Sequence, residues 1–367
     1  MADGAHALCD PPFFRVPAHR RALPEEPSVI RIRHALLAVL LAAAATACGS
    51  AQGAAKPGGA EVKELRYQGN VGSVTYPELA EDLGYLGDIK LKWVGNTTSG
   101  PQDIQSAATG QTDFGGAFNG AIIKLKAAGA PIKAVIGYYG SDQRSFNGYY
   151  VTGNSPIRTA RDLIGKKIGV NTLGAHHEAV IKEYLKRAGL TPQEIRQVQL
   201  VVIPPVNTEQ ALRQGQLDVG TLGGVLKDKA LQRGGLRPLF TDIDLFGPFT
   251  AGSVVLREDF IARNPTTTRK FVEAYAKAID WAQTHPREEV VARFQKIIAK
   301  RGRNEDATTV AFWKSTGIAG KGGVIAGKEF QTWIDWLARE GEIKPGQVKA
   351  ADLYTNAYNP YANGSGS

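Results

Sequence analysis

Short β-like runs alternate with longer helical stretches along most of this chain, beginning at Glu64. The β-like runs are rich in branched and aromatic residues, whereas the stretches between them repeat apolar residues with a helical period. The first expected strands are 65–68, 89–94, 132–139 and 149–152, with helices at 76–84 and 104–109. A second set of the same kind begins with the strand 167–170. This alternation predicts an α/β fold in which helices cover both faces of a parallel-rich sheet.

Clusters of proline and glycine interrupt the pattern at 153–156 and again at 246–249. After the second cluster, one more strand precedes a region that reads almost entirely as helices from Asn264 onward. Two such interruptions indicate two lobes, the second inserted into the first, with a helical C-terminal part and a hinged cleft between the lobes. The expected boundaries are lobe I at 61–152 and 249–358, lobe II at 153–248, and a tail at 359–367.

Composition excludes several functional classes. The 367 residues are 43% hydrophobic and 22% charged, which is typical of a folded globular protein. The net charge of +9 is spread along the chain, so a nucleic-acid partner is not expected. Only Cys9 and Cys48 are present, which excludes a disulfide scaffold and any zinc or iron–sulfur site built from several cysteines.

The N-terminal part has the pattern of a secretory signal. An apolar run at 35–45 follows basic residues and is too short to span a bilayer. Cys48 follows Ala-Thr-Ala and resembles a bacterial lipobox, which predicts cleavage after residue 47 and lipidation of Cys48; the alternative is an ordinary signal peptide. We therefore expect a signal peptide at 1–47 with an over-long start, a lipid-anchored linker at 48–60, and a protein held outside the cytoplasm on the outer face of the membrane.

Several segments together resemble the substrate-binding proteins of ABC importers, in the branch that binds aliphatic sulfonates, nitrate, taurine and pyrimidine precursors. The most specific is Asp-Leu-Ile-Gly-Lys-Lys at 162–167, and others are 99–101, 107–113 and 210–218. The resemblance covers about 65–341. It implies a two-lobed periplasmic-binding-protein type II fold and an extracytoplasmic monomer that delivers a small organic anion to a permease and its ATPase. An aliphatic sulfonate is the leading ligand; nitrate, taurine and a thiamine pyrimidine precursor are alternatives, and no cofactor is expected.

The chemistry of anion binding narrows the candidate residues. Helix N-termini carry N–H groups without intrahelical partners at the positive end of the helix dipole, which favours an anion there. Candidate N-termini after strand ends lie at 72–76, 98–100, 118–120 and 173–177. The candidate ligand-binding residues are Gln68, Asn70, Ser99, Gly100, Asn119, Arg144, Gly174, Ala175, His176 and His177.

Each candidate side chain also has a simpler interpretation. His176 either donates a hydrogen bond to an anionic head group or forms a capping pair with His177. Arg144 either clamps two ligand oxygens or stays in solvent. Gln68 and Asn119 either bond the ligand or cap turns. The glycine-rich segment 219–225 replaces a Trp-rich stretch of many resembled proteins, which either brings the backbone close to the ligand or leaves room for a larger one.

An enzyme on the same fold is the competing class of function. The chain has no Gly-x-Ser-x-Gly elbow, phosphate-binding loop or Gly-x-Gly-x-x-Gly, and it lacks the cysteine cluster of the pyrimidine-precursor synthases. His176-x-Glu178 has no cysteine pair to complete a deaminase zinc site. We therefore expect a binding protein with no catalytic residues and no metal.

Overall fold

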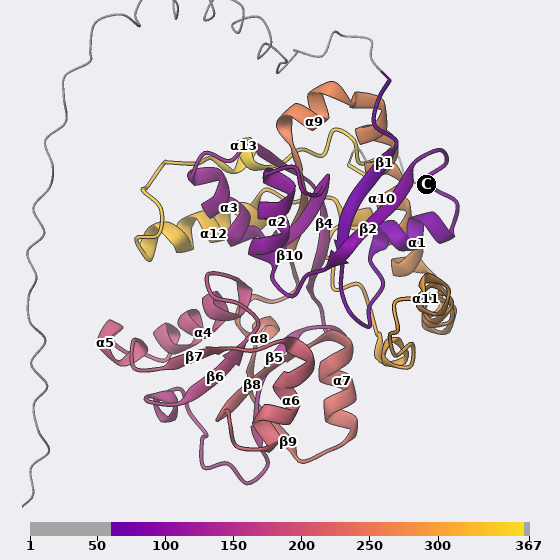
Figure 1. The fold of residues 1–367 in the computed structure, drawn as a ribbon. Helices are drawn as coiled ribbons and strands as arrows, with labels where there is room; N and C mark the ends of the chain where they lie inside the picture. Colours follow the sequence, from indigo (N-terminus) through magenta and orange to yellow (C-terminus); the bar gives the residue numbers. More distant parts are fainter. Residues whose placement is uncertain (1–59, 363–367) are drawn as a thin grey trace, which may run out of the picture. The chain divides into compact units, whose positions relative to one another are not determined.

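The computed structural model describes residues 60–362. The predicted signal peptide, the lipidation of Cys48 and nearly all of the predicted linker lie outside this range. Within it, no helix is long and apolar enough to cross a membrane. The described part has two groups of strands, each with its own covering helices. Figure 1 shows one group around strands β4 (Ile132–Ser141) and β10 (Phe249–Arg257) and the other around strands β5 (Asn147–Thr152) and β9 (Leu236–Thr241).

The first lobe contains a parallel pair of strands and a three-stranded sheet. In the pair, Leu65 lies opposite Leu91. In the sheet, β10 lies between β3 and β4 and runs antiparallel to both. Every residue of β3 is buried, and two of the helices of this lobe pack against it. The elements are β1 (Glu64–Gly69), α1 (Tyr76–Asp82), β2 (Lys90–Asn96), α2 (Gly100–Ala108), β3 (Phe114–Phe118), α3 (Asn119–Ala127), β4 (Ile132–Ser141) and β10 (Phe249–Arg257).

The second lobe is a five-stranded sheet in the order β7-β6-β8-β5-β9. Strand β6 is parallel to β7 and β8, whereas β5 is antiparallel to β8 and β9. Pro238 lies in β9, an edge strand, where the missing N–H breaks no central ladder. The elements are β5 (Asn147–Thr152), η1 (Arg161–Leu163), β6 (Lys167–Val170), α4 (His176–Arg187), α5 (Pro192–Ile195), β7 (Gln199–Val202), α6 (Pro205–Arg213), β8 (Val219–Gly223), α7 (Gly224–Gln232), β9 (Leu236–Thr241) and α8 (Asp242–Phe246).

The strand pairing places the first crossing between lobes earlier than the sequence suggests. Strand β5, expected at the end of lobe I, pairs with β8 and β9 of the second sheet. The chain therefore crosses within 142–146, between β4 and β5, and not at 153–156. It returns between Phe246 and Phe249.

A buried carboxylate ties the two crossings together. Asp242, at the start of α8, is completely buried and accepts hydrogen bonds from the Ser141 hydroxyl (2.7 Å) and from the side-chain amide of Asn147 (3.0 Å). The Asn147 N–H also donates to it, at 3.1 Å. Since Ser141 ends β4 and Asn147 begins β5, one side chain joins both sides of the hinge region.

The C-terminal helices pack on the first lobe. The longest, α10, begins with Pro265 at a position where a missing N–H costs nothing, and buries Phe271 and Tyr275 against β1 and β3. Residues 359–362 of the expected tail also pack on the body, since Asn359 is buried and donates to the Gly322 carbonyl (2.9 Å). The remaining elements are α9 (Glu258–Arg263), α10 (Pro265–Thr284), α11 (Arg287–Arg301), η2 (Thr309–Phe312), η3 (Lys321–Gly323), α12 (Lys328–Arg339) and α13 (Ala350–Leu353).

Trp333 of α12 gives a direct test of this packing. Its ring is 1% exposed and contacts the rings of Phe118, Phe246 and Trp336. We predict that Trp333→Ala lowers the free energy of unfolding by about 3–5 kcal/mol, because a large cavity remains. Thr332→Ala, an exposed change on the same helix, should stay within about 0.5 kcal/mol of the parent. Urea unfolding of both variants measures the difference, and equal midpoints would contradict the packing.

Candidate ligand-binding cavity

A cavity of about 530 Å³ opens between the two lobes. The first lobe supplies the loops that follow β1 and β2, together with parts of β3 and β4. The second lobe supplies the starts of α4, α6 and α7. Segments after α11 close one side through Val310, Trp313 and Ser315. Both lobes and the C-terminal part therefore contribute to one site.

Besides α1, whose start carries a capping box of Thr75 and Glu78, four helices begin at the cavity wall: α2, α4, α6 and α7. The lining residues at their first turns are Ser99 and Gly100, Ala175 to His177, Pro205 and Val206, and Gly223 to Val225. No side chain caps any of these four helix starts. Their N–H groups and dipoles consequently place positive potential at the cavity, the condition that favours an anion.

The cavity wall itself carries little charge. Among its described lining residues there is no lysine or arginine, and the only acidic or histidine side chains are Asp103, His176 and His177. Asp103 accepts a hydrogen bond from the Gly116 N–H at 2.7 Å, and burial raises its pKa to about 7. Its second oxygen, Oδ1, has no partner among the described residues.

Both histidines are neutral at pH 7. Burial lowers the pKa of His176 to about 3, and burial together with the neighbouring His176 lowers that of His177 to about 3. The His176 ring stacks on Phe118, with 5.3 Å between ring centres, and its Nε2 lies 3.4 Å from Asp242 Oδ2. A neutral imidazole offers one donor and one acceptor, so these rings can bond a ligand without adding positive charge.

Two polar contacts join the lobes at the rim of the cavity. The Asn171 side chain donates to the Thr98 carbonyl at 3.2 Å, and the hydroxyls of Ser99 and Thr172 are 3.3 Å apart. Asn171 and Thr172 follow β6 in the second lobe, whereas Thr98 and Ser99 follow β2 in the first. These contacts bring the lobes together beside the start of α2.

Seven of the ten residues expected at the site line the cavity, and three lie elsewhere. The seven are Gln68, Asn70, Ser99, Gly100, Ala175, His176 and His177. The Asn119 amide is buried and bonds the carbonyls of Thr250 and Glu329 and the Ser253 hydroxyl, so it joins β10 to α12. Gly174 donates its N–H to Glu178, and Arg144 lies beside a separate hollow of about 270 Å³. We therefore leave Asn119, Gly174 and Arg144 out of the proposed site.

The apolar part of the wall includes residues that sequence reasoning did not single out. Phe118 and Tyr138 line the cavity from β3 and β4, and Gly223 and Gly224 line it from the glycine-rich segment. The additional apolar and aromatic residues include Val71, Val74, Phe114, Tyr139, Val206, Leu226, Val254, Tyr275, Phe294, Val310 and Trp313. Phe294 and Trp313 come from the C-terminal region, and no local pattern connects them with the cleft.

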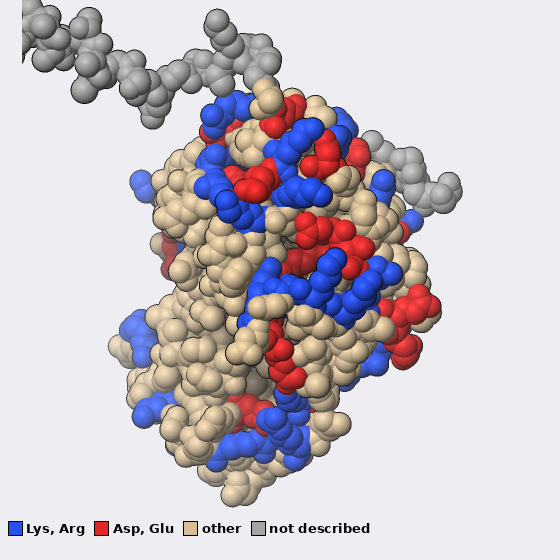
Figure 2. Space-filling model, turned by 45° about the vertical axis from the view of Figure 1, so that its right-hand side comes forward, with Lys and Arg blue, Asp and Glu red and all other residues tan. Residues whose placement is uncertain are grey.

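No group of three or more histidine, cysteine, aspartate or glutamate side chains within residues 60–362 is arranged to hold a metal ion. On the face shown in Figure 2, lysine and arginine side chains are interspersed with aspartate and glutamate, and no continuous basic surface extends across it.

Comparison with known proteins agrees with the architecture. Residues 79–289 match the family described as NMT1/THI5 like. The alkanesulfonate-binding protein SsuA from Xanthomonas axonopodis pv. citri, solved with bound MOPS, superposes with a TM-score of 0.62 at 20% identity, over 81% of this chain and 99% of that one. At this identity the likeness shows the fold, a two-lobed periplasmic-binding-protein architecture.

Two curated relatives differ in function. A protein of Escherichia coli (strain K12) whose name describes aliphatic sulfonate binding is 29% identical over 164 residues, 44% of this chain and 49% of its own length. A 4-amino-5-hydroxymethyl-2-methylpyrimidine phosphate synthase of Candida albicans is 25% identical over 224 residues, 57% of this chain and 63% of its own length. This chain thus spans about half to three fifths of the curated relatives it matches.

The pKa directions predict how stability responds to pH. Each histidine binds a proton in the unfolded chain below about pH 6.5 but in the folded chain only below about pH 3, so acidification through this interval should destabilise the fold. Asp103 responds to pH in the opposite direction. Because burial raises its pKa to about 7 in the folded chain, its contribution to the stability of the fold decreases as pH rises from about 4 to 7. Melting temperatures between pH 4 and 7 should therefore no longer fall on acidification in the double variant His176→Gln/His177→Gln, which keeps the opposite dependence of Asp103, and should fall more steeply on acidification in Asp103→Asn. Parallel profiles for all three proteins would contradict these assignments.

Proposed function

This chain belongs to the NMT1/THI5-like family, and we propose that it is the substrate-binding component of an ABC importer that captures a small organic anion between its two lobes. The observation that carries the proposal is the convergence of four uncapped helix starts on one interlobe cavity. Such donors bind an anion without a fixed cationic side chain. Closure of the lobes around the ligand would then present a changed surface to a permease.

The size and lining of the cavity favour an anion with an apolar body. A volume of about 530 Å³ suits a small organic molecule, whereas a four-atom nitrate ion would leave most of it to water. The aromatic rings of Tyr138, Tyr275, Phe294 and Trp313 supply apolar contact area. We therefore propose an aliphatic sulfonate with a sizeable hydrocarbon or ring substituent, in preference to nitrate or taurine.

A neutral hydrogen-bonding ring is the second candidate ligand. The side-chain oxygens Gln68 Oε1 and Asp103 Oδ1 belong to lining residues and have no partner among the described residues. An amino group on a thiamine pyrimidine precursor would offer donors to such acceptors. The Candida albicans relative acts on that class of compound according to its name.

We propose binding and not catalysis as the activity. The ionisable side chains of the described cavity wall are neutral or buried, and the Ser99 hydroxyl bonds to Thr172 and not to a base. Cys48 lipidation, attachment to the outer face of the membrane, a monomeric state and a partner permease with its ATPase remain parts of the proposal. The lobe boundaries we propose follow the sheet pairing, with lobe II between the crossings at 142–146 and 246–249.

Thermal shift and calorimetry on the processed chain test this function. The panel is hexanesulfonate, MOPS, taurine, nitrate and 4-amino-5-hydroxymethyl-2-methylpyrimidine. We expect hexanesulfonate or MOPS to raise the melting temperature most, since a ligand at about 100 times its Kd adds about 2.7 kcal/mol to folded-state stability. A larger shift with the pyrimidine would replace the sulfonate by the second candidate, and no shift with any compound would reject the function.

A histidine variant localises the binding. We predict that His176→Ala weakens sulfonate binding about tenfold, the value of one hydrogen bond to a charged group. His285→Ala is the matched control, because its ring is exposed and stacks on Trp281 away from the cavity. Calorimetric Kd values decide the matter: unchanged affinity in His176→Ala would remove His176 from the site.

A further inference from the structure

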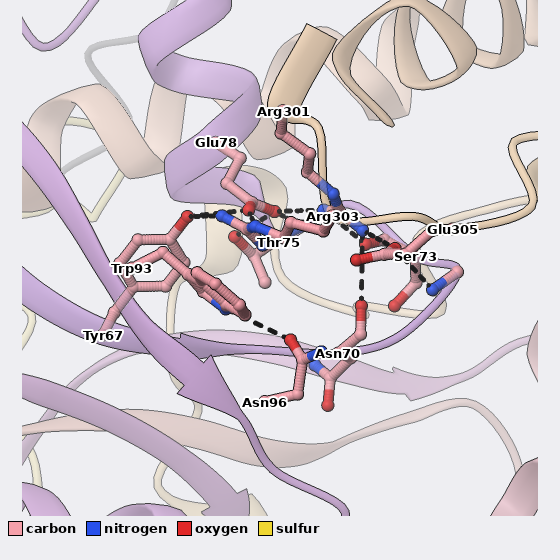
Figure 3. Close-up of polar contacts among 11 residues, drawn as sticks. Tyr67, Asn70, Ser73, Thr75, Glu78, Trp93, Asn96, Arg301, Arg303 and Glu305 are labelled. Carbon is pink, nitrogen blue, oxygen red and sulfur yellow. Dashed lines mark hydrogen bonds and ion pairs between the residues drawn. The ribbon is translucent and has the colours of Figure 1, made fainter. Parts of the chain in front are cut away.

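A buried charge network lies behind the loop that connects β1 to α1 (Figure 3). Arg301 ends α11, Arg303 and Glu305 follow it, and Glu78 lies in the first turn of α1. All four side chains are at most 8% exposed. Arg301 pairs with Glu78 (3.1 Å) and with Glu305, and Arg303 pairs with Glu78 (2.9 Å). Two positive and two negative charges thus compensate one another, so loss of one leaves a buried partner uncompensated.

Aromatic side chains complete this network. The Tyr67 hydroxyl donates to Glu78 (2.7 Å) and accepts from Arg303 (2.7 Å), and the Arg303 guanidinium lies 4.4 Å from the centre of the Trp93 ring. The turn that presents the arginines has left-handed backbone at Gly302 and at Asn304. Asn304 is the only non-glycine residue with positive φ in the described chain. Its strained backbone is held because both neighbouring side chains are anchored.

The network is bonded to the backbone of the loop at several points. The Arg301 guanidinium donates to the carbonyls of Ser73 (3.0 Å) and Asn70 (3.5 Å). Glu305 accepts the N–H of Gly72 (2.8 Å), and Glu78 accepts the N–H of Thr75 (2.9 Å). The contacts between Arg301 and Ser73 join residues 228 positions apart in the sequence. Residues 70–75 are therefore fixed from behind by a segment of the C-terminal part.

This anchoring determines where the loop directs its donors. In a trans peptide, the carbonyl of one residue and the N–H of the next point in opposite directions, and the described chain has no cis peptide bond. Because Arg301 holds the Ser73 carbonyl, the Val74 N–H must point away from Arg301. Val74 lines the cavity, and its N–H has no hydrogen-bond partner among the described residues.

We propose that Arg301 and Glu305 are positioning residues for ligand binding, because they hold the β1–α1 loop with the Val74 N–H directed at the ligand's anionic group. The inference rests on the proposed function of the cavity. Neither side chain lines the cavity itself, so both act through the backbone of residues 70–75. A wall that is already ordered before binding loses less conformational entropy when the ligand arrives.

The substitution Arg301→Lys tests this role, with Arg293→Lys as the matched control. Lysine keeps the charge but lacks the planar fork that reaches two carbonyls and two carboxylates. Arg293 lies on the same helix and bonds to the same partner helix, at Asp82 (2.8 Å) near the end of α1 that is distant from the loop. Two readouts apply to both variants: hydrogen exchange of a peptide covering 70–76, and the calorimetric Kd for hexanesulfonate and MOPS.

We expect Arg301→Lys to speed exchange in 70–76 and to weaken sulfonate binding about tenfold. Arg293→Lys should leave exchange in 70–76 unchanged and alter the Kd less than about twofold. Equal Kd values for the two variants, or unchanged exchange in Arg301→Lys, would overturn the positioning role. Failure of the parent protein itself to bind either sulfonate would instead reject the proposed function, and the positioning role with it.

Discussion

An α-helix that begins at the edge of a cavity leaves N–H groups there without partners, and this protein places four such helix starts around one space. The arrangement follows from the two-sheet fold, because α2, α4, α6 and α7 all follow strands whose ends face the gap between lobes. With no lysine or arginine in the described lining, positive potential at the cavity comes from backbone donors and helix dipoles. Neutral His176 and His177 then add direction to the hydrogen bonding without adding charge.

Charged side chains are nevertheless present close behind the wall, where they are compensated. Arg301 and Arg303 pair with Glu78 and Glu305. These ion pairs hold the β1–α1 loop, and their compensated charges add no net positive charge beside the cavity. Asp242 has a comparable place at the crossings, where it joins Ser141 to Asn147. In both places a buried acid organises backbone from distant parts of the chain. The cavity is therefore shaped by groups that do not touch it.

The sequence predicted the boundaries of a helix or strand well where neighbouring residues determine them. Strand β6 begins and ends where the sequence indicates, since the apolar run is bounded by the preceding lysines and the following Asn171. Helix α7 begins within the glycine-rich segment 219–225, where no helix is expected from the sequence, because glycine is acceptable at a helix start. Strand β5 was assigned to the first lobe because period-two alternation identifies a strand and says nothing of its partners. Asn119 illustrates the same limit for sites: a buried amide suits a ligand or a core equally, and only the positions of Thr250 and Glu329 decide.

The most direct test of an anion site without cationic side chains is the salt dependence of its affinity. Isothermal titration with MOPS or hexanesulfonate at ionic strengths from about 50 mM to about 500 mM should change Kd by less than about twofold, since buried hydrogen bonds and helix N-termini are weakly screened. Weakening by about tenfold or more across that range would show that exposed cationic side chains hold the ligand, and would contradict this account of the cavity.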